Sequence, residues 1–73
     1  MPQLPILSGE KIIKVLERIG YHQGKQRGSH IRLAHSECRS VTVPNYESVS
    51  RGLLRKILRD AELSSDEFIK ILK

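Results

Sequence analysis

The chain has 73 residues, enough for one small domain whose hydrophobic core is near the lower limit for independent folding. Such a chain cannot enclose a deep active-site cavity, so any chemistry is expected in a surface groove or on an open sheet face. The formal net charge of +5 is uneven: residues 1–44 carry seven Lys and Arg against three Glu, whereas residues 45–73 carry six Lys and Arg against five acids. A positive front half favours polyanionic partners, of which nucleic acid is the commonest.

The cysteine content and the N-terminal sequence indicate a soluble, cytoplasmic protein. Cys38 is the single cysteine, so an intrachain disulfide is impossible and a reducing compartment fits. The N-terminus lacks the charged start and apolar run of a signal peptide. No apolar stretch approaches the roughly 20 residues that a membrane-spanning helix needs. Residues 1–73 are therefore expected to form a single domain that does not enter a membrane.

The first third of the chain predicts an extended segment followed by a helix. Residues 1–7 contain two prolines and are expected to be extended. Ser8 is a good N-cap, and Glu10 in the first turn complements the helix dipole. The following apolar residues have the 3.6-residue period of a helix: Ile12, Ile13, Leu16 and Ile19. Because Gly20 suits a helix end, a helix is expected over residues 9–19.

Between residues 21 and 44 the hydrophobic period changes to two, as in β-strands. Residues 30–34 and 40–43 alternate and are rich in β-branched side chains, and residues 21–26 form a weaker first strand. Short segments with Gly and Ser mark the turns between them. This pattern predicts a three-stranded antiparallel meander.

The C-terminal part predicts two more helices. Ser50 caps the first, and its apolar stripe consists of Leu53, Leu54, Ile57, Leu58 and Ala61. Ser64 and Glu67 match a capping box, so a short third helix is expected to begin at Ser65. The predicted fold class is α+β, in the order α-β-β-β-α-α, with the helices covering one face of the sheet.

His30 is the strongest candidate for a functional residue. Ile31 and Leu33 are the apolar members of their strand and should face the helices, so His30 should project from the opposite, bare face. A neutral imidazole can take a proton from a hydroxyl, and RNA carries a hydroxyl beside every phosphodiester. Cations nearby would stabilise the charge that develops on the phosphate oxygens. The candidates for that role are Lys25, Arg27 and Arg32. An ordinary exposed histidine among solvated charges is the alternative.

The other histidines and the cysteine do not predict a metal site. His35 lies five residues after His30, so an unbroken strand would place it on the other face, where a strand-end role is expected. The face of His22 is not determined. A structural zinc site needs four converging ligands, usually in paired spacings, and Cys38 with three dispersed histidines does not supply them. No metal and no cofactor are expected.

Three arginines recur every four residues and form a ridge along the second predicted helix: Arg51, Arg55 and Arg59. Such a ridge is most often a solvated face. Its functional interpretation is a track for the RNA backbone, helped by the free N–H groups at the helix start.

Three segments of the chain, taken together, resemble the HicA toxin family. They are Gly28-Ser29-His30, the sequence RSVTVP at residues 39–44, and GLLRKILR at residues 52–59, which is followed by Leu63-Ser64-x-x-Glu67-Phe68. Their order and spacing match the family from about residue 7 to residue 72. The resemblance implies a fold like that of the double-stranded RNA-binding domain, metal-independent mRNA cleavage and a cognate HicB-type antitoxin. It places the catalytic histidine at His30. Ser29 is expected to help set the turn that presents His30 and is counted with the RNA-binding, phosphate-stabilising residues.

Some positions depart from the family's usual pattern. Ile31 and Tyr46 stand where many members have histidine, Leu53 where threonine is common, and Glu62 where glycine is frequent. These differences concern secondary contacts and substrate preference. The group that protonates the leaving 5′-oxygen stays open between water, Lys25 and Tyr46.

Two rival functions are compatible with a small basic domain. A non-catalytic double-stranded RNA-binding module would share the element order and the charge, but it would have no use for a particular histidine on the bare face. A DNA-binding helix-turn-helix protein fits poorly, because a β-meander separates the first two predicted helices.

Overall fold

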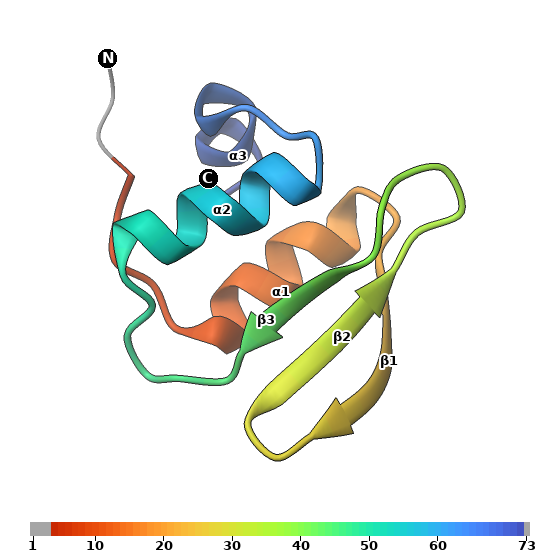
Figure 1. Ribbon diagram of the computed structural model, residues 1–73. Coiled ribbons are helices and arrows are strands. Elements are labelled where there is room, and N and C mark those ends of the chain that lie inside the picture. Colours follow the sequence, from red (N-terminus) through yellow and green to blue (C-terminus); the bar gives the residue numbers. More distant parts are fainter. Residues whose placement is uncertain (1–3, 73) are drawn as a thin grey trace.

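The computed structural model describes residues 4–72, which form a helix, three strands and two further helices (Figure 1). The elements are α1 (Gly9–Arg18), β1 (His22–Arg27), β2 (His30–Ala34), β3 (Val41–Pro44), α2 (Arg51–Asp60) and α3 (Ser65–Leu72). The predicted α+β class and the α-β-β-β-α-α order are confirmed. The bounds of α1, β1 and β3 differ from the predicted ones by one residue. The first three residues of the predicted extended segment lie outside the described residues.

Serine hydroxyls cap the N-termini of the helices, as the sequence predicts. Ser8 and Ser50 each accept a hydrogen bond from the backbone N–H three residues further on, at 3.2 Å. Before α3, the Ser64 hydroxyl accepts from the Glu67 N–H at 3.1 Å and donates to the Glu67 carboxylate at 3.0 Å. In a full capping box the carboxylate would instead accept from the backbone N–H of the cap residue. One half of the predicted box is therefore formed as expected, and the other half is replaced by a side-chain contact.

The C-terminal ends of α1 and α2 share one hydrogen-bond pattern but use different residues. Gly20 follows α1 with φ 105°, and Glu62 follows α2 with φ 57°. In both places, the N–H of this residue donates a hydrogen bond to the carbonyl three residues earlier. The N–H of the next residue donates to the carbonyl five residues before it, and all four distances are 2.9–3.2 Å. This is the Schellman motif, in which glycine normally takes the left-handed position. Glu62 is the only non-glycine residue with positive φ in the described part of the chain.

The strands form an antiparallel sheet in the order β1-β2-β3, and the helices lie to one side of it (Figure 1). α1 and α2 pack against β3, whereas α3 packs on α1 and α2. The expectation that the helices cover the sheet therefore holds for α1 and α2, while α3 adds an outer layer. The core between these layers consists of Leu4, Ile12, Ile13, Val15, Leu16, Tyr21, Ile31, Leu33, Val41, Val43, Val49, Leu54, Ile57, Leu58, Ala61 and Phe68.

β1 lies beyond the helices, and all six of its residues are exposed. Its sequence, HQGKQR, has no apolar side chain to bury, so the strand is held by its pairing with β2. None of the helices described between residues 4 and 72 is long and apolar enough to cross a bilayer.

The first two residues of the loop between β3 and α2 are hydrogen-bonded to two other parts of the protein. The Gly9 N–H at the start of α1 donates to the Tyr46 carbonyl at 2.8 Å, and the Asn45 N–H donates to the Ser29 carbonyl. A side chain at Gly9 would collide with the Pro44 carbonyl oxygen, so this close approach requires glycine. The loop is thereby tied to the turn that precedes β2.

Candidate functional site

The outer face of β2 carries His30 and Arg32, as strand parity predicts. Ile31 is 7% exposed and Leu33 is fully buried, whereas His30 and Arg32 are exposed. The β1–β2 turn brings His30 to the start of its strand. Gly28 has φ 55° in the first central position of this two-residue turn, which is the place that a type II′ turn reserves for glycine. Gly28 supplies the positive φ of the turn. The Ser29 carbonyl accepts the hydrogen bond from Asn45 in the loop between β3 and α2.

A β-bulge gathers the cations of β1 onto this same face. Gln23 pairs with Leu33 and Gln26 with Ile31, so two residues, Gly24 and Lys25, lie opposite Arg32 alone. The extra residue shifts the alternation of β1 by one position. Arg27 consequently pairs with His30 and projects to the same side of the sheet. Without the bulge, the alternation that puts Gln23 inward would have turned Arg27 inward as well.

These side chains line a shallow cavity of about 300 Å³ on the bare sheet face: Lys25, Arg27, His30, Arg32 and Thr42. In the described part of the chain, the one ion pair within 4.0 Å joins Lys14 to Glu10 on α1, at 3.7 Å. The three cations around His30 are therefore not neutralised by acids of this protein. An anion that reached this cavity would meet an imidazole and three cationic side chains.

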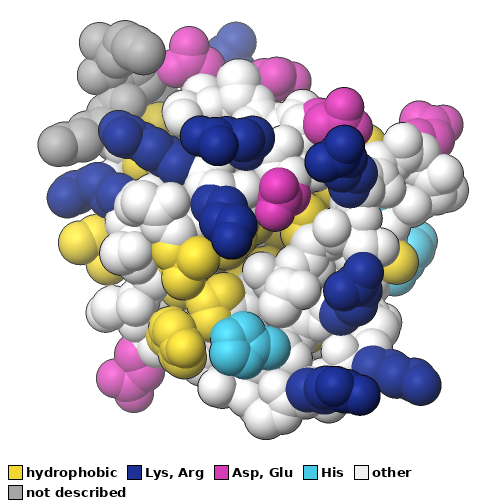
Figure 2. All heavy atoms as spheres, in the orientation of Figure 1, with side chains coloured by type: hydrophobic (Ala, Val, Ile, Leu, Met, Phe, Trp, Pro, Cys, Tyr) yellow, Lys and Arg dark blue, Asp and Glu magenta, His cyan; other side chains and the backbone are white. Residues whose placement is uncertain are grey.

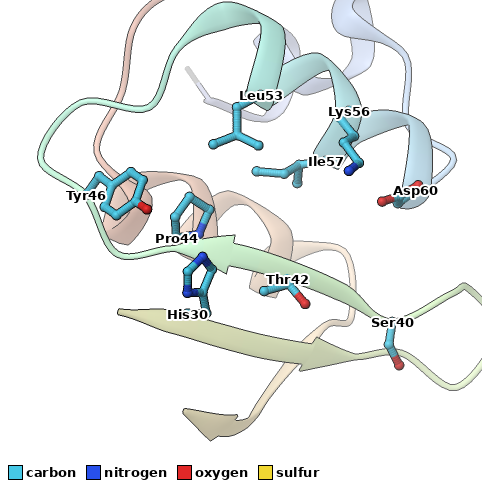
Figure 3. Close-up of a pocket in the computed structure, with 9 residues that line it drawn as sticks. All are labelled: His30, Ser40, Thr42, Pro44, Tyr46, Leu53, Lys56, Ile57 and Asp60. Atoms are coloured by element: carbon cyan, nitrogen blue, oxygen red, sulfur yellow. The ribbon is translucent and has the colours of Figure 1, made fainter. Parts of the chain in front are cut away.

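A second cavity, of about 360 Å³, lies between β3 and α2 and also has His30 in its wall. We call it the β3–α2 groove; its lining residues are His30, Ser40, Thr42, Pro44, Tyr46, Leu53, Lys56, Ile57 and Asp60 (Figure 3). The side chains of Lys56 and Asp60 point from α2 toward the strand, and the His30 ring lies below Pro44 in this view. His30 therefore stands where the basic sheet face meets the groove.

Tyr46 forms one end of the groove and lies beside the candidate histidine. The ring centroids of Tyr46 and His30 are 6.3 Å apart, with an interplanar angle of 70°. Tyr46 is 45% exposed, one of two large hydrophobic side chains that stay exposed among residues 4–72. Figure 2 shows hydrophobic side chains at the surface beside a histidine, with Lys and Arg side chains on either side.

The arginine ridge of α2 lies on the other side of that helix. Leu53, Lys56, Ile57 and Asp60 recur at the three- and four-residue spacing that marks one helix face. Arg51, Arg55 and Arg59 follow the opposite flank of the buried stripe and line neither cavity. Arg51 also has a structural contact, because its Nε donates to the Leu4 carbonyl at 2.6 Å. The α2 cation that lines the groove together with His30 is Lys56.

Most of the groove residues were not predicted from the sequence as site residues, among them Lys56, Asp60 and Thr42. Lys56 and Asp60 were hidden because the arginines give a more conspicuous charge pattern on the same helix. Thr42 shares the parity of the outward residues in β3, and its pairing with Arg32 could have suggested it. The spacing of Leu53, Lys56 and Asp60 was the available signal for the groove.

His35 has a structural role, as its strand-end position predicts. Its Nδ1 accepts hydrogen bonds from the Glu37 and Cys38 N–H groups at 2.9 and 3.2 Å, so its Nε2 is the nitrogen that donates to the Ile19 carbonyl, at 2.8 Å. The ring also packs edge-on against Tyr21 at 4.9 Å. Both nitrogens are therefore committed to the backbone. His22, whose face the sequence did not determine, pairs with Ala34 and is exposed on the outer side.

Tyr21 is a core residue that also secures the loop before β3. Its side chain is 1% exposed, and its hydroxyl donates to the Arg39 carbonyl at 2.8 Å. Burial raises the pKa of the Tyr21 hydroxyl above its usual value, with smaller contributions from Cys38, Glu62 and Asp60. The hydroxyl is thus kept as a donor to the backbone.

The fold and the site together define a class: a small α-β-β-β-α domain of the double-stranded RNA-binding type, with a histidine among unpaired cations on its bare sheet face. The model of a family described as the HicA toxin of bacterial toxin-antitoxin matches residues 9–63, which are 55 of the 73 residues. The chain belongs to this family, as the sequence resemblance indicated, and is a toxin of the toxin-antitoxin type. A search of curated proteins found no match.

Proposed function

We propose that the protein is an endoribonuclease that cleaves mRNA without a metal ion, with His30 as the general base. The observation that carries this proposal is the position of His30, exposed among Lys25, Arg27 and Arg32 and at the border of the β3–α2 groove. Membership of a toxin family supports an attack on a cellular polymer such as mRNA. A basic, open face suits a long polyanion better than a small metabolite.

In the proposed reaction, the His30 imidazole removes the proton of a ribose 2′-hydroxyl. The 2′-oxygen then attacks the adjacent phosphorus, and the bond from phosphorus to the 5′-oxygen of the next nucleotide breaks. Lys25, Arg27 and Arg32 would stabilise the charge on the phosphate oxygens during this step. The leaving 5′-oxygen takes a proton from water, Lys25 or Tyr46. The products are one fragment with a 2′,3′-cyclic phosphate and one with a 5′-hydroxyl.

The side chains around His30 support an internal nucleophile. Metal-assisted hydrolysis uses clusters of carboxylate, His or Cys ligands. Among residues 4–72, no three such side chains converge on one point. An imidazole surrounded by cations is instead suited to proton transfer next to a phosphate.

The arginine ridge and the antitoxin complete the proposal. Arg51, Arg55 and Arg59 would extend the grip on the RNA backbone away from the reacting phosphate. A cognate HicB-type antitoxin would inhibit the toxin by covering the face of His30 and Arg32. Because this face is positively charged, the covering surface should be acidic.

Cleavage of an RNA substrate by the wild-type protein and by His30→Ala tests the mechanism. We expect His30→Ala to lower the rate by about 10²–10⁴-fold or more, since a positioned general base typically contributes that much. His22→Ala, which removes another exposed histidine of the outer face, is the matched control and should cleave normally. The fragments should carry the two end groups named above, with or without EDTA. Cleavage abolished by EDTA, or 5′-phosphate ends, would refute this mechanism.

The rival function, a non-catalytic double-stranded RNA-binding module, has support from the same fold and charge. The same experiment distinguishes the two functions. A binding module would show no cleavage in either protein, and His30→Ala would leave its RNA affinity unchanged.

A further inference from the structure

We infer that the β3–α2 groove binds one unpaired nucleobase of the RNA, next to the scissile phosphate, and prefers guanine. The proposed base site rests on the RNA cleavage proposed above. It would give the toxin a sequence preference at the nucleotide that it holds. The general base, the phosphate-binding cations and the base site would then form one continuous surface.

The position of the groove next to His30 is the first observation that supports a base site. His30 lines both cavities, so a phosphate held among Lys25, Arg27 and Arg32 lies beside the mouth of the groove. A nucleotide that places its 2′-hydroxyl at His30 must send its base, or that of its neighbour, in some direction from the sheet. The groove is the concave surface that adjoins His30 on the side of α2 (Figure 3). At about 360 Å³ it is at the small end of ligand pockets and suits one base rather than a helix of RNA.

The walls of the groove suit a flat, aromatic ligand. Tyr46, Leu53 and Pro44 supply an aromatic ring and apolar side chains at one end. Proteins that hold single-stranded RNA commonly stack an unpaired base on an aromatic side chain. Tyr46 is also preorganised for that role, since its carbonyl accepts from Gly9 and its neighbour Asn45 is held by Ser29.

The opposite end of the groove offers a donor and an acceptor side by side. Lys56 and Asp60 are four residues apart on α2 and both point into the groove, yet they are not within ion-pair distance of each other. Asp60 is also the last residue of α2, where a negative charge opposes the helix dipole. Helix stability therefore does not explain an acid at this position. Both groups stay available to a ligand.

Guanine is the base whose edge matches this pair. Its N1–H and N2–H groups are adjacent donors that a single carboxylate can accept together, and its O6 acceptor lies next to them for an ammonium group. Uracil has one N–H between two carbonyls, and adenine and cytosine each have one amino group. A carboxylate in the groove therefore forms two hydrogen bonds with guanine and one with any other base.

Binding to the uncleaving His30→Ala protein tests the base site apart from the chemistry. The probes are fluorescein-labelled RNA pentamers of uridine in which the central base is G, A, C or U, and the readout is anisotropy. We expect the G pentamer to bind about tenfold more tightly than the U pentamer, because a bidentate pair typically discriminates by about that factor or more. Adding Asp60→Asn should reduce the difference to less than about twofold.

Two control variants separate recognition from charge and from folding. Asp66→Asn removes the same charge from an exposed site on α3 and should leave the guanine preference intact. Tyr46→Ala should weaken binding of every pentamer by about tenfold, the loss expected when a stacking ring is removed, whereas Tyr46→Phe should retain it. Equal affinity for all four pentamers, or a guanine preference that survives Asp60→Asn, would overturn the base site.

Cleavage by the wild-type protein shows which base is held and separates the two proposals. The substrates are 2′-deoxy strands with a single ribonucleotide, in which the base on either side of the scissile phosphate is varied. We expect faster cleavage with guanine at one of these two positions only. Cleavage without any base preference would refute the base site and leave the nuclease standing. Guanine-selective binding without cleavage of any substrate would refute the nuclease and leave the base site standing.

Discussion

At the scale of single residues, the three histidines differ in what their ring nitrogens contact. His35 uses both nitrogens to join the end of β2 to the end of α1 and to the following turn. His30 and His22 stand on the outer face and are exposed. The same side chain thus serves as a structural link at one position and as a candidate base at another. Strand parity predicted that His30 would be exposed on the outer face, and the position of His35 at the strand end predicted its structural role.

His35→Ala should therefore destabilise the fold, whereas His30→Ala should not. The substitution at His35 leaves the Ile19 carbonyl and two backbone N–H groups without their partner, and each unsatisfied group of this kind costs about 1–3 kcal/mol where water cannot replace the ring. Because these groups are only partly buried, we expect a loss of about 2 kcal/mol in the free energy of unfolding. Urea denaturation measures it.

His30→Ala is the matched comparison, since it removes the same side chain from an exposed site. It should change the free energy of unfolding by less than about 0.5 kcal/mol. At temperatures where the His35→Ala protein is still folded, the His35→Ala protein should cleave RNA as the wild type does. Equal destabilisation by the two substitutions would contradict the roles assigned to them.

At the scale of the elements, local sequence signals predicted the helix ends, whereas the bulge in β1 and the position of α3 depend on long-range packing. Caps such as Ser8 and Ser50 act within one turn of the chain, so the sequence located the helices to within a residue. The bulge at Gly24 and Lys25 depends on the pairing of β1 with β2, and the glycine inside the strand was its local signal. The outer position of α3 likewise depends on how α1 and α2 fill the face of the sheet first.

The groove shows the same limit at the candidate site. Parity alone put His30 on the bare face, because the apolar and polar positions of β2 alternate without a break. That Lys56 and Asp60 stand across from it depends on the angle and distance at which α2 crosses β3. The arginine spacing on α2 predicted a track for the RNA backbone on one flank of that helix, and the groove beside His30 lies on the other flank. The charge pattern of a helix thus identifies a charged face, but it does not show which other part of the protein lies opposite that face.

The end of α2 offers a test of backbone strain. Glu62 has φ 57°, a conformation that costs a non-glycine residue about 1–2 kcal/mol. Glycine would avoid this cost, but it would also increase the conformational entropy of the unfolded chain, which offsets part of the gain. Glu62→Gly should therefore raise stability by up to about 1 kcal/mol, which for a chain of this size raises the melting temperature by roughly 4–8 °C. Thermal unfolding followed by circular dichroism measures the shift.

The equivalent position after α1 supplies the opposite control. Gly20→Ala places a Cβ in the left-handed region and 2.8 Å from the His35 Nε2, so it should lower the melting temperature. If Glu62→Gly also lowers the melting temperature, then the Glu62 side chain has a stabilising role that its φ angle does not reveal.

At the scale of the whole molecule, two groups of three cations lie on different surfaces. Lys25, Arg27 and Arg32 surround His30 on the sheet, and the arginine ridge follows the far flank of α2. Composition alone predicted a polyanion partner but could not say which surface it meets. The proposed cleavage puts the reacting phosphate on the sheet face, so cations there should contribute most to the electrostatic part of RNA binding.

The salt dependence of RNA binding tests this division, because each neutralised phosphate of a single strand adds about −0.7 to the slope of log K against log salt concentration. With three sheet cations engaged, the His30→Ala protein should give a slope of about −2 or steeper with a uridine pentamer. Arg27→Gln with Arg32→Gln should make the slope shallower by about 1.4. Arg55→Gln with Arg59→Gln removes the same charge and should change it by less than half as much. A larger change from the ridge pair than from the sheet pair would mean that the RNA crosses α2 rather than the sheet, and His30 would then lie away from the scissile phosphate.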